Sequence, residues 1–220
     1  MLERGITEII NEALVTNVFG KDFQFREGQR EVIEAICNHY LEDPEGTIIL
    51  DAPTGSGKSL IAMWSAHVLK ELGKRGYLVT SDLMLQDQYE EDFKRLKLNW
   101  PSIRGVDNYN CNVNDLPFSL ADCKMKGIGY EAAEKLPCWG TCGYLQGRKR
   151  AKELPVALFN YSYYLIQRNY VEDKMQEQDR EIPFPIRDFV FFDEAHKVDS
   201  IVQSHFSPRI DRTTTKIFKE

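Results

Sequence analysis

A glycine-rich loop, "DAPTGSGKSL" at residues 51–60, constrains the fold of this chain more than any other feature. It follows the apolar run "TIIL" at 47–50 and leads into a helical pattern of apolar residues. Glycines in such a loop let successive backbone N–H groups turn toward a polyphosphate, and the N-terminus of the following helix adds partial positive charge. The sequence therefore predicts a strand, a phosphate-binding loop and a helix, in that order.

The polar residues of the loop have separate roles in this interpretation. Lys58 reaches the β and γ phosphates of a nucleotide, and Ser59 binds Mg²⁺. A glycine-rich turn without a ligand would explain the glycines, but not the lysine, the serine and the flanking elements. Ala52 stands where the general pattern has its first glycine. The residues expected to contact ATP are Ala52, Pro53, Thr54, Gly55, Ser56, Gly57, Lys58 and Ser59.

Short apolar strands alternate with helical patterns along the chain. The helical patterns cover 60–72 and 83–96, each directly after a predicted strand. This alternation predicts an α/β fold in which helices cover a parallel sheet. The pattern fails at 101–150, where we expect an inserted subdomain. The predicted strands are 47–50, 77–80, 156–159 and 189–192.

An acidic pair follows the last predicted strand, in "FVFFDEAH" at 189–196. Asp193, at the carboxyl end of the strand, would hold Mg²⁺ through water, and Glu194 would orient and deprotonate the attacking water. Taken alone, the tetrapeptide would often be only an acidic helix N-terminus. The phosphate loop upstream favours the interpretation as a nucleotide-hydrolysing site.

Charge and hydropathy argue against a membrane protein and against a uniformly basic coat for nucleic acid. No apolar run approaches the roughly 18 residues of a membrane span, and the start "MLERGITEII" is too charged for a signal peptide. The net charge of -6 leaves room for a local basic path only. We therefore expect an intracellular, cytoplasmic protein, nuclear in a eukaryote, with no membrane partner.

Four of the five cysteines, Cys111, Cys123, Cys138 and Cys142, lie in the irregular segment, separated by 11, 14 and 3 residues. Clustered cysteines in an intracellular protein indicate a metal site rather than disulfides. Four thiolates suit tetrahedral zinc or a [4Fe-4S] cluster, and the spacing does not choose between them. Cys37 lies in an apolar helical face and is expected in the core.

The two nucleotide motifs resemble those of the superfamily 2 helicases, with 52–59 as motif I and 193–196 as the DEAH form of motif II. That family commonly has alanine at the position of Ala52. The resemblance implies catalytic roles for Lys58, Asp193, Glu194 and His196. "FREGQREVIEAI" resembles the Arg-x-x-Gln signature of the family, which implies adenine-side contacts for Arg26 and Gln29.

The segment "VTSDLMLQDQ" resembles motif Ia, which implies that Thr80, Ser81 and Gln86 line the path of single-stranded nucleic acid. Two further segments, "RGVDNYNC" at 104–111 and "LPVALFNYSYYL" at 154–165, resemble the XPD/DinG helicases. These helicases carry an iron–sulfur domain at this point of the chain. The resemblance therefore implies a [4Fe-4S] cluster on the four cysteines, with zinc as the less favoured alternative.

The basic run "GRKRAK" at 147–152 follows the last of these cysteines. A charge run is usually a solvated face. In the XPD/DinG helicases, however, the cluster domain meets the duplex junction as the motor moves 5′ to 3′ on single-stranded DNA, which favours phosphate contact. The residues concerned are Arg148, Lys149, Arg150 and Lys152.

The family architecture also includes a second RecA-like domain that brings an arginine finger, and the residues after His196 leave no room for one. We therefore expect the chain to be the N-terminal, ATP-binding half of a DNA helicase, weakly active by itself. Its expected parts are 1–100 (first part of RecA-like motor domain 1), 101–150 (iron–sulfur insertion), 151–205 (remainder of the motor domain) and 206–220 (start of a further insertion).

The alternative function is a non-catalytic, ATP-responsive nucleic-acid binding module whose metal cluster is structural or redox-sensing. ATPase assays with and without single-stranded DNA separate the two. A P-loop kinase or other nucleotide transferase is disfavoured, because it would not need the Arg-x-x-Gln signature and Asp-Glu-Ala-His together. Partners other than single-stranded DNA, duplex junctions and the second motor domain are not indicated by the sequence.

Overall fold

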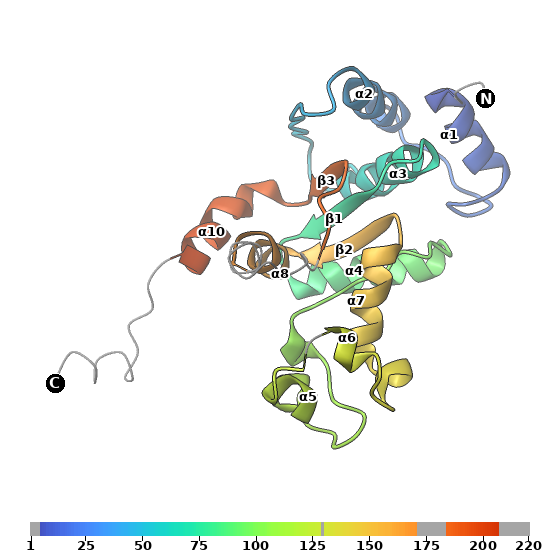
Figure 1. Ribbon diagram of the computed structural model, residues 1–220. Coiled ribbons are helices and arrows are strands. Elements are labelled where there is room, and N and C mark those ends of the chain that lie inside the picture. The colour runs from blue at the N-terminus through green and yellow to red at the C-terminus, as the bar shows by residue number, and fades with distance from the viewer. Residues whose placement is uncertain (1–4, 129, 171–183, 207–220) are drawn as a thin grey trace.

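A parallel sheet lies at the centre of the computed structural model, which describes residues 5–128, 130–170 and 184–206 (Figure 1). Within these residues the sheet has three strands, in the order β2-β1-β3, and both neighbours of β1 run parallel to it. All residues of the central strand are buried. The strands are β1 (Gly76–Thr80), β2 (Val156–Asn160) and β3 (Phe189–Phe192).

The two faces of the sheet belong to two separate cores, because successive strand residues point to opposite sides. Leu78 and Leu158 pack into the core beneath the N-terminal helices. Val79 and Phe159 pack into the other core, which also contains buried cysteines. The sheet is therefore covered on both faces, as parallel sheets generally are.

The first core is built with four helices: α1 (Ile6–Val15), α2 (Gln29–Glu42), α3 (Lys58–Glu71) and α4 (Leu83–Arg95). The second core contains residues of α7 (Gly143–Glu153) and α8 (Tyr161–Leu165), and partly buried residues of α10 (Val198–Phe206) pack against it. A π-helical turn, η4 (Ile166–Tyr170), follows α8, and η5 (Ala195–Lys197) precedes α10. The mixed α/β architecture with a small parallel sheet agrees with the sequence-based expectation for the motor.

The segment 101–150, here called the cysteine lobe, extends away from the sheet at the bottom of Figure 1. Before α7 its described part contains only short elements: η1 (Val106–Asn108), η2 (Phe118–Leu120), α5 (Asp122–Met125), α6 (Tyr130–Ala133) and η3 (Trp139–Thr141). A parallel bridge between Ser102 and Leu158 joins the start of the lobe to β2. Its last helix, α7, continues past the predicted boundary at 150.

The prediction of a strand at 47–50 is wrong. The structure assigns these residues to no regular element, and the Ile49 side chain is 89 % exposed. A β-branched run becomes a strand only when a neighbouring strand accepts its backbone hydrogen bonds. Among the described residues β3 pairs with β1 alone. The other three predicted strands are confirmed, and so are the helices predicted at 60–72 and 83–96, which correspond to α3 and α4.

None of the helices in the described ranges combines the length and the apolar character that crossing a bilayer requires. The further insertion predicted at 206–220 lies, except for its first residue, outside the described residues.

Candidate functional site

The two predicted magnesium residues lie in direct contact. Ser59, in the first turn of α3, donates a hydrogen bond from Oγ to Oδ2 of Asp193 over 2.8 Å, although 134 positions separate the two in sequence. Asp193 directly follows β3, and its N–H donates to the Val79 carbonyl over 2.9 Å. The sheet therefore brings the end of the phosphate loop and the acidic motif to one edge.

The backbone of the phosphate loop takes a conformation that requires glycine at two positions. Gly55 and Gly57 adopt φ values of 82° and 86°, in the left-handed region that other residues rarely occupy. Lys58 Nζ folds back over the loop and donates to the carbonyls of Ala52 at 2.8 Å and Pro53 at 3.3 Å. The lysine charge is thus held at the mouth of the loop. Thr54 is exposed, while Ser56 Oγ is buried and has no hydrogen-bond partner among the described residues.

The Arg-x-x-Gln signature supports the same loop from the side. Arg26 donates from a guanidinium nitrogen to the Gly55 carbonyl, and Gln29 Nε2 donates to the Ser56 carbonyl over 2.8 Å. The pair is itself joined, since the Arg26 N–H donates to Gln29 Oε1 over 2.9 Å. A Cβ on Gly57 would come within 2.6 Å of Gln29 Nε2, so the glycine is needed for this close approach.

A second hydroxyl holds the Asp193 carboxylate. Tyr89, on α4, donates from its phenol to Oδ2 over 2.9 Å, while the N–H of Glu194 donates to Oδ1 over 3.0 Å. Burial, and next the charge of Asp193, raise the pKa of Tyr89 well above its usual value, so the phenol remains a donor. Sequence reasoning missed this role, because Tyr89 fits the apolar periodicity of its helix and carries no other signal.

Glu194, the expected general base, has a left-handed backbone with φ of 58°. Such a conformation is uncommon for a residue other than glycine and tends to occur at functional sites. His196 Nδ1 lies 3.2 Å from Glu194 Oε2, and its side chain is largely exposed. Tyr161 donates to the main-chain carbonyl of Asp193 over 3.1 Å, which fixes the turn that leaves β3.

The three candidates for the nucleic-acid path have different surroundings. Thr80 and Gln86 are completely buried, whereas Ser81 is half-buried. Gln86 Nε2 donates to Ser102 Oγ over 2.7 Å, and its Oε1 accepts from Asn160 Nδ2 over 3.1 Å. Contrary to the expectation, the side chains of Thr80 and Gln86 therefore support the sheet edge from inside instead of presenting a surface.

An ion pair links the acidic motif to the segment around Ser81. Lys197 Nζ, in η5, donates to Ser81 Oγ over 3.2 Å and lies 3.4 Å from Asp82 Oδ2. Asp82 also caps α4, since its Oδ1 accepts from the Leu85 N–H over 3.0 Å. That backbone hydrogen bond, followed by smaller contributions from Ser81 and Lys197, lowers the pKa of Asp82. The start of α4 is thus tied to the segment that follows Glu194.

The basic candidates of the lobe all belong to α7. The Arg148 guanidinium lies over the rings of Tyr144 and Phe184, at 5.8 and 5.5 Å from their centroids. Arg150 is exposed and donates to Asn99 Oδ1 over 2.7 Å. Arg148 is therefore partly engaged in intramolecular stacking, and the other residues of the set are exposed or half-buried: Lys149, Arg150 and Lys152.

The four clustered cysteines are free thiols that approach one another. Cys111 and Cys142 are buried, and Cys123 and Cys138 are half-buried. Burial raises the pKa of Cys123, and the neighbouring thiols Cys111 and Cys138 raise it further. Burial likewise raises the pKa of Cys142, with a further rise from Cys138 and Cys123. Cys111 and Cys142 belong to the second core with Cys123 packed against it, and the Cys142 N–H donates to the Cys138 carbonyl over 3.0 Å, so the lobe brings the four cysteines to one region.

The four cysteines lie near one another, but they do not form a metal-coordination geometry. Within the described ranges, no group of three or more His, Cys, Asp and Glu side chains is arranged to hold a metal ion. A cavity of ≈ 90 Å³ is lined in part by Phe118, Leu145 and one of the four cysteines, Cys123. The lone Cys37 differs from this group, since it lies fully buried in the first core as expected.

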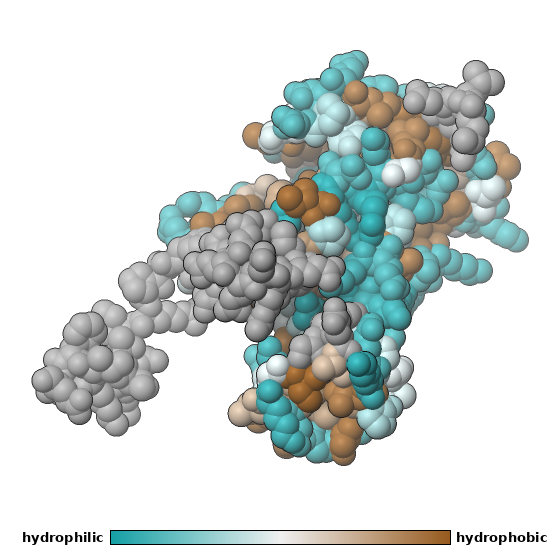
Figure 2. All heavy atoms as spheres, in the orientation of Figure 1, coloured by the Kyte–Doolittle hydropathy of each residue, from teal (hydrophilic) through white to brown (hydrophobic). Residues whose placement is uncertain are grey.

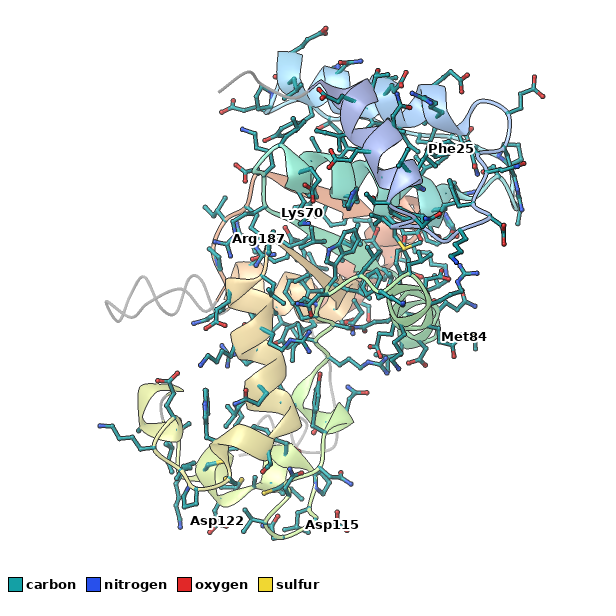
Figure 3. All side chains as sticks on the ribbon, turned by 90° about the vertical axis from the view of Figure 1, so that its right-hand side faces the viewer. Phe25, Lys70, Met84, Asp115, Asp122 and Arg187 are labelled. Carbon is teal, nitrogen blue, oxygen red and sulfur yellow. The ribbon has the colours of Figure 1, made fainter. Side chains whose placement is uncertain are left out.

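Arg187 joins α7, the last helix of the lobe, to the sheet: its guanidinium donates to the Ala151 carbonyl in the last turn of α7. Figure 3 shows it near that end of the helix. The guanidinium also donates to the carbonyls of Gly76 at 2.9 Å, Pro155 at 3.1 Å and Leu154 at 2.9 Å, and lies 4.3 Å from the Tyr77 ring centroid. Burial lowers the pKa of Arg187 to about 10. Nothing in the sequence distinguishes it from a surface arginine.

The family described as "Type III restriction enzyme, res subunit" matches residues 22–216. The matched range begins ahead of Arg26 and continues past His196, so it contains both nucleotide motifs and the whole cysteine lobe. No curated protein matches the chain.

Proposed function

Because the chain belongs to the type III restriction enzyme res subunit family, a family of superfamily 2 helicase motors, we propose that it couples ATP hydrolysis to movement on nucleic acid. The contact between Ser59 Oγ and Asp193 Oδ2 at 2.8 Å carries this proposal. It joins the phosphate loop to the acidic motif, which is the arrangement that a magnesium–nucleotide site requires.

The residues of the site divide the chemistry among them. The N–H groups of the loop and the Lys58 ammonium bind the phosphates, while Ser59 and Asp193 hold Mg²⁺. The metal supplies neutralisation of phosphate charge. Glu194 orients the attacking water and accepts its proton, and His196 lies against the Glu194 carboxylate. Arg26 and Gln29, which brace the loop, are proposed to contact the adenine side as well.

The finer proposal concerns the track and its direction. We assign single-stranded DNA and duplex junctions as the nucleic-acid partners, with movement 5′ to 3′, on the resemblance to the XPD/DinG helicases. Ser81 and the basic residues of α7 are the surface candidates for phosphate contact. A second RecA-like domain would supply the arginine finger, which is worth about 10³ to 10⁵ in rate.

We also propose that the cysteine lobe holds a [4Fe-4S] cluster on Cys111, Cys123, Cys138 and Cys142, with zinc as the less favoured alternative. The packing of the lobe supports this proposal: Cys111 and Cys142 lie in one buried cluster with Cys123 against it, and the Cys142 N–H donates to the Cys138 carbonyl over 3.0 Å. When bound, the metal would neutralise the charge of the thiolates. On this proposal, residues 1–100 and 151–205 form the motor and 101–150 the cluster insertion.

The test measures ATP binding and hydrolysis with and without single-stranded DNA, in the unmutated chain and in Glu194→Gln. We expect both proteins to bind Mg-ATP. Hydrolysis by the unmutated chain should be slow and stimulated by DNA, while Glu194→Gln should be inactive. Binding without any DNA-stimulated hydrolysis, also after addition of a second motor domain, would favour a non-catalytic module instead.

A further inference from the structure

We infer that Tyr89 is a positioning residue whose hydroxyl orients the Asp193 carboxylate and thereby sets the affinity of the site for Mg²⁺. This inference rests on the proposed function, because it assumes that Asp193 serves a magnesium–nucleotide site. The phenol of Tyr89 donates to the Asp193 carboxylate, so its effect on the metal is exerted through that carboxylate.

The geometry of the hydrogen bond carries the inference. The Tyr89 side chain is only 3 % exposed, and its ring packs edge-on against Phe93 at 6.0 Å between centroids. These contacts direct the phenolic oxygen at Asp193 Oδ2, 2.9 Å away and 104 positions distant in sequence. A hydroxyl fixed by a buried ring loses little freedom when it makes its hydrogen bond, so it holds the carboxylate at a defined angle.

The hydrogen bonds that the Asp193 carboxylate accepts show which of its oxygens is left for the metal. An ionised carboxylate has about four acceptor positions, two on each oxygen. Ser59 and Tyr89 donate to Oδ2, and the Glu194 N–H donates to Oδ1. One acceptor position therefore remains on Oδ1, where it is available to water bound to magnesium. Removal of the phenol would free a position on Oδ2 and let the carboxylate rotate.

The position of Tyr89 on α4 gives this hydrogen bond a wider consequence. The helix begins next to Asp82, which caps it and pairs with Lys197. The same helix carries Gln86, which bonds to Asn160 at the end of β2. Tyr89 thus connects the magnesium carboxylate to the element that starts at the candidate nucleic-acid path.

The experiment compares Tyr89→Phe with the unmutated chain in a titration of a fluorescent ATP analogue at increasing Mg²⁺ concentration. The substitution removes one oxygen and keeps the packed ring. We expect the half-saturating Mg²⁺ concentration to rise about tenfold, as for loss of a hydrogen bond to a charged group, while nucleotide binding in EDTA stays unchanged. Tyr77→Phe is the matched control, because Tyr77 is also buried and its hydroxyl donates to the Pro185 carbonyl and not to Asp193.

A double-mutant cycle with Asp193→Asn separates positioning from general destabilisation. If Tyr89 acts through the carboxylate, Tyr89→Phe should have no further effect on Mg²⁺ dependence in the Asp193→Asn background. Additive effects, or an unchanged Mg²⁺ midpoint in Tyr89→Phe alone, would overturn the inference. Absence of any Mg²⁺-dependent nucleotide binding by the unmutated chain would instead overturn the proposed function.

Discussion

The sheet with its N-terminal helices and the cysteine lobe differ in how their residues are buried. In α3 alone, eight residues are buried, among them Trp64, which stacks on Phe19 with 4.0 Å between ring centroids. The lobe before α7 has only short elements and a small core. Large apolar residues are exposed in both regions, and Figure 2 shows hydrophobic side chains on the surface of the lobe. The exposed residues of the lobe include Val113, Leu116, Leu120 and Met125.

This difference indicates how each region is stabilised. Burial of apolar surface accounts for the sheet and its helices, because regular elements present continuous apolar faces. The lobe has a small core around Phe118 and Leu145, and two of its four clustered thiols are buried beside it. Asp115 and Asp122 lie at the end farthest from the sheet (Figure 3). We therefore expect the stability of the lobe to depend on the metal proposed to bind its thiols, and the stability of the sheet region not to depend on it.

The largest expected effect is the loss of metal binding by the lobe, with the nucleotide site left intact. Cys138→Ser should abolish metal binding, whereas anaerobically purified unmutated protein should be brown and hold about four irons per chain. ATP affinity should remain within about twofold, because the nucleotide residues lie at the sheet edge. Iron analysis and nucleotide titration measure both quantities. Cys37→Ser is the control that should stay brown, and stoichiometric zinc without iron would show that the lobe holds the other metal.

The next effect concerns the nucleotide site alone. Lys58→Ala should weaken Mg-ATP binding by about 100-fold or more, because charge-assisted hydrogen bonds to the phosphates are lost. The metal content of the lobe should not change. Calorimetric titration and iron analysis test the two statements together, and equal ATP affinity in the variant would refute the assignment of the phosphate loop.

The third prediction concerns Arg187, which links the last helix of the lobe to the sheet. Arg187→Met should lower the free energy of unfolding by about 2 kcal/mol, because buried carbonyls of β1 and of the end of α7 lose their donor. Denaturant unfolding followed by tryptophan fluorescence measures this loss. Arg95→Met, at a largely exposed arginine, is the control and should change stability little. Equal stability of the two variants would mean that Arg187 does not hold the regions together.

A smaller effect is expected at the basic face of α7. Replacing Lys149, Arg150 and Lys152 by Gln should weaken binding of single-stranded DNA about tenfold and flatten its salt dependence, because fewer counterions are released. ATP binding should be unaffected. Fluorescence anisotropy at several salt concentrations gives the slope. An unchanged slope would identify this face as merely solvated.

The smallest effect concerns the pH dependence that the buried thiol of Cys37 gives to the stability of the sheet region. Burial raises the pKa of Cys37 to about 12, so its thiol stays protonated in the folded protein at a pH where the unfolded chain loses that proton. The resulting stabilisation is present below pH 9 and is lost as the pH rises toward 12, by about 1.4 kcal/mol per pH unit. Cys37→Ala should show a shallower decline between pH 9 and 10 in denaturant unfolding.

Local sequence determined the motor motifs and most of the regular elements. Strands at 77–80, 156–159 and 189–192 and the helices after the first two candidate strands are confirmed, because each depends on short-range apolar periodicity. The order of phosphate loop and acidic motif likewise indicated a superfamily 2 motor, which the family match supports. The same apolar pattern wrongly predicted a strand at 47–50, because a strand forms only where a neighbouring strand accepts its hydrogen bonds.

Only the tertiary structure decided the contacts between distant segments. Tyr89 reaches Asp193, and Arg187 reaches the carbonyls at the end of α7, although neither residue differs locally from an ordinary helix or surface residue. Burial of Gln86 beneath the sheet edge also depends on how α4 packs on β2. Hydrogen bonds of this kind are specified by chain folding over tens of residues, which local periodicity and motif spacing do not encode.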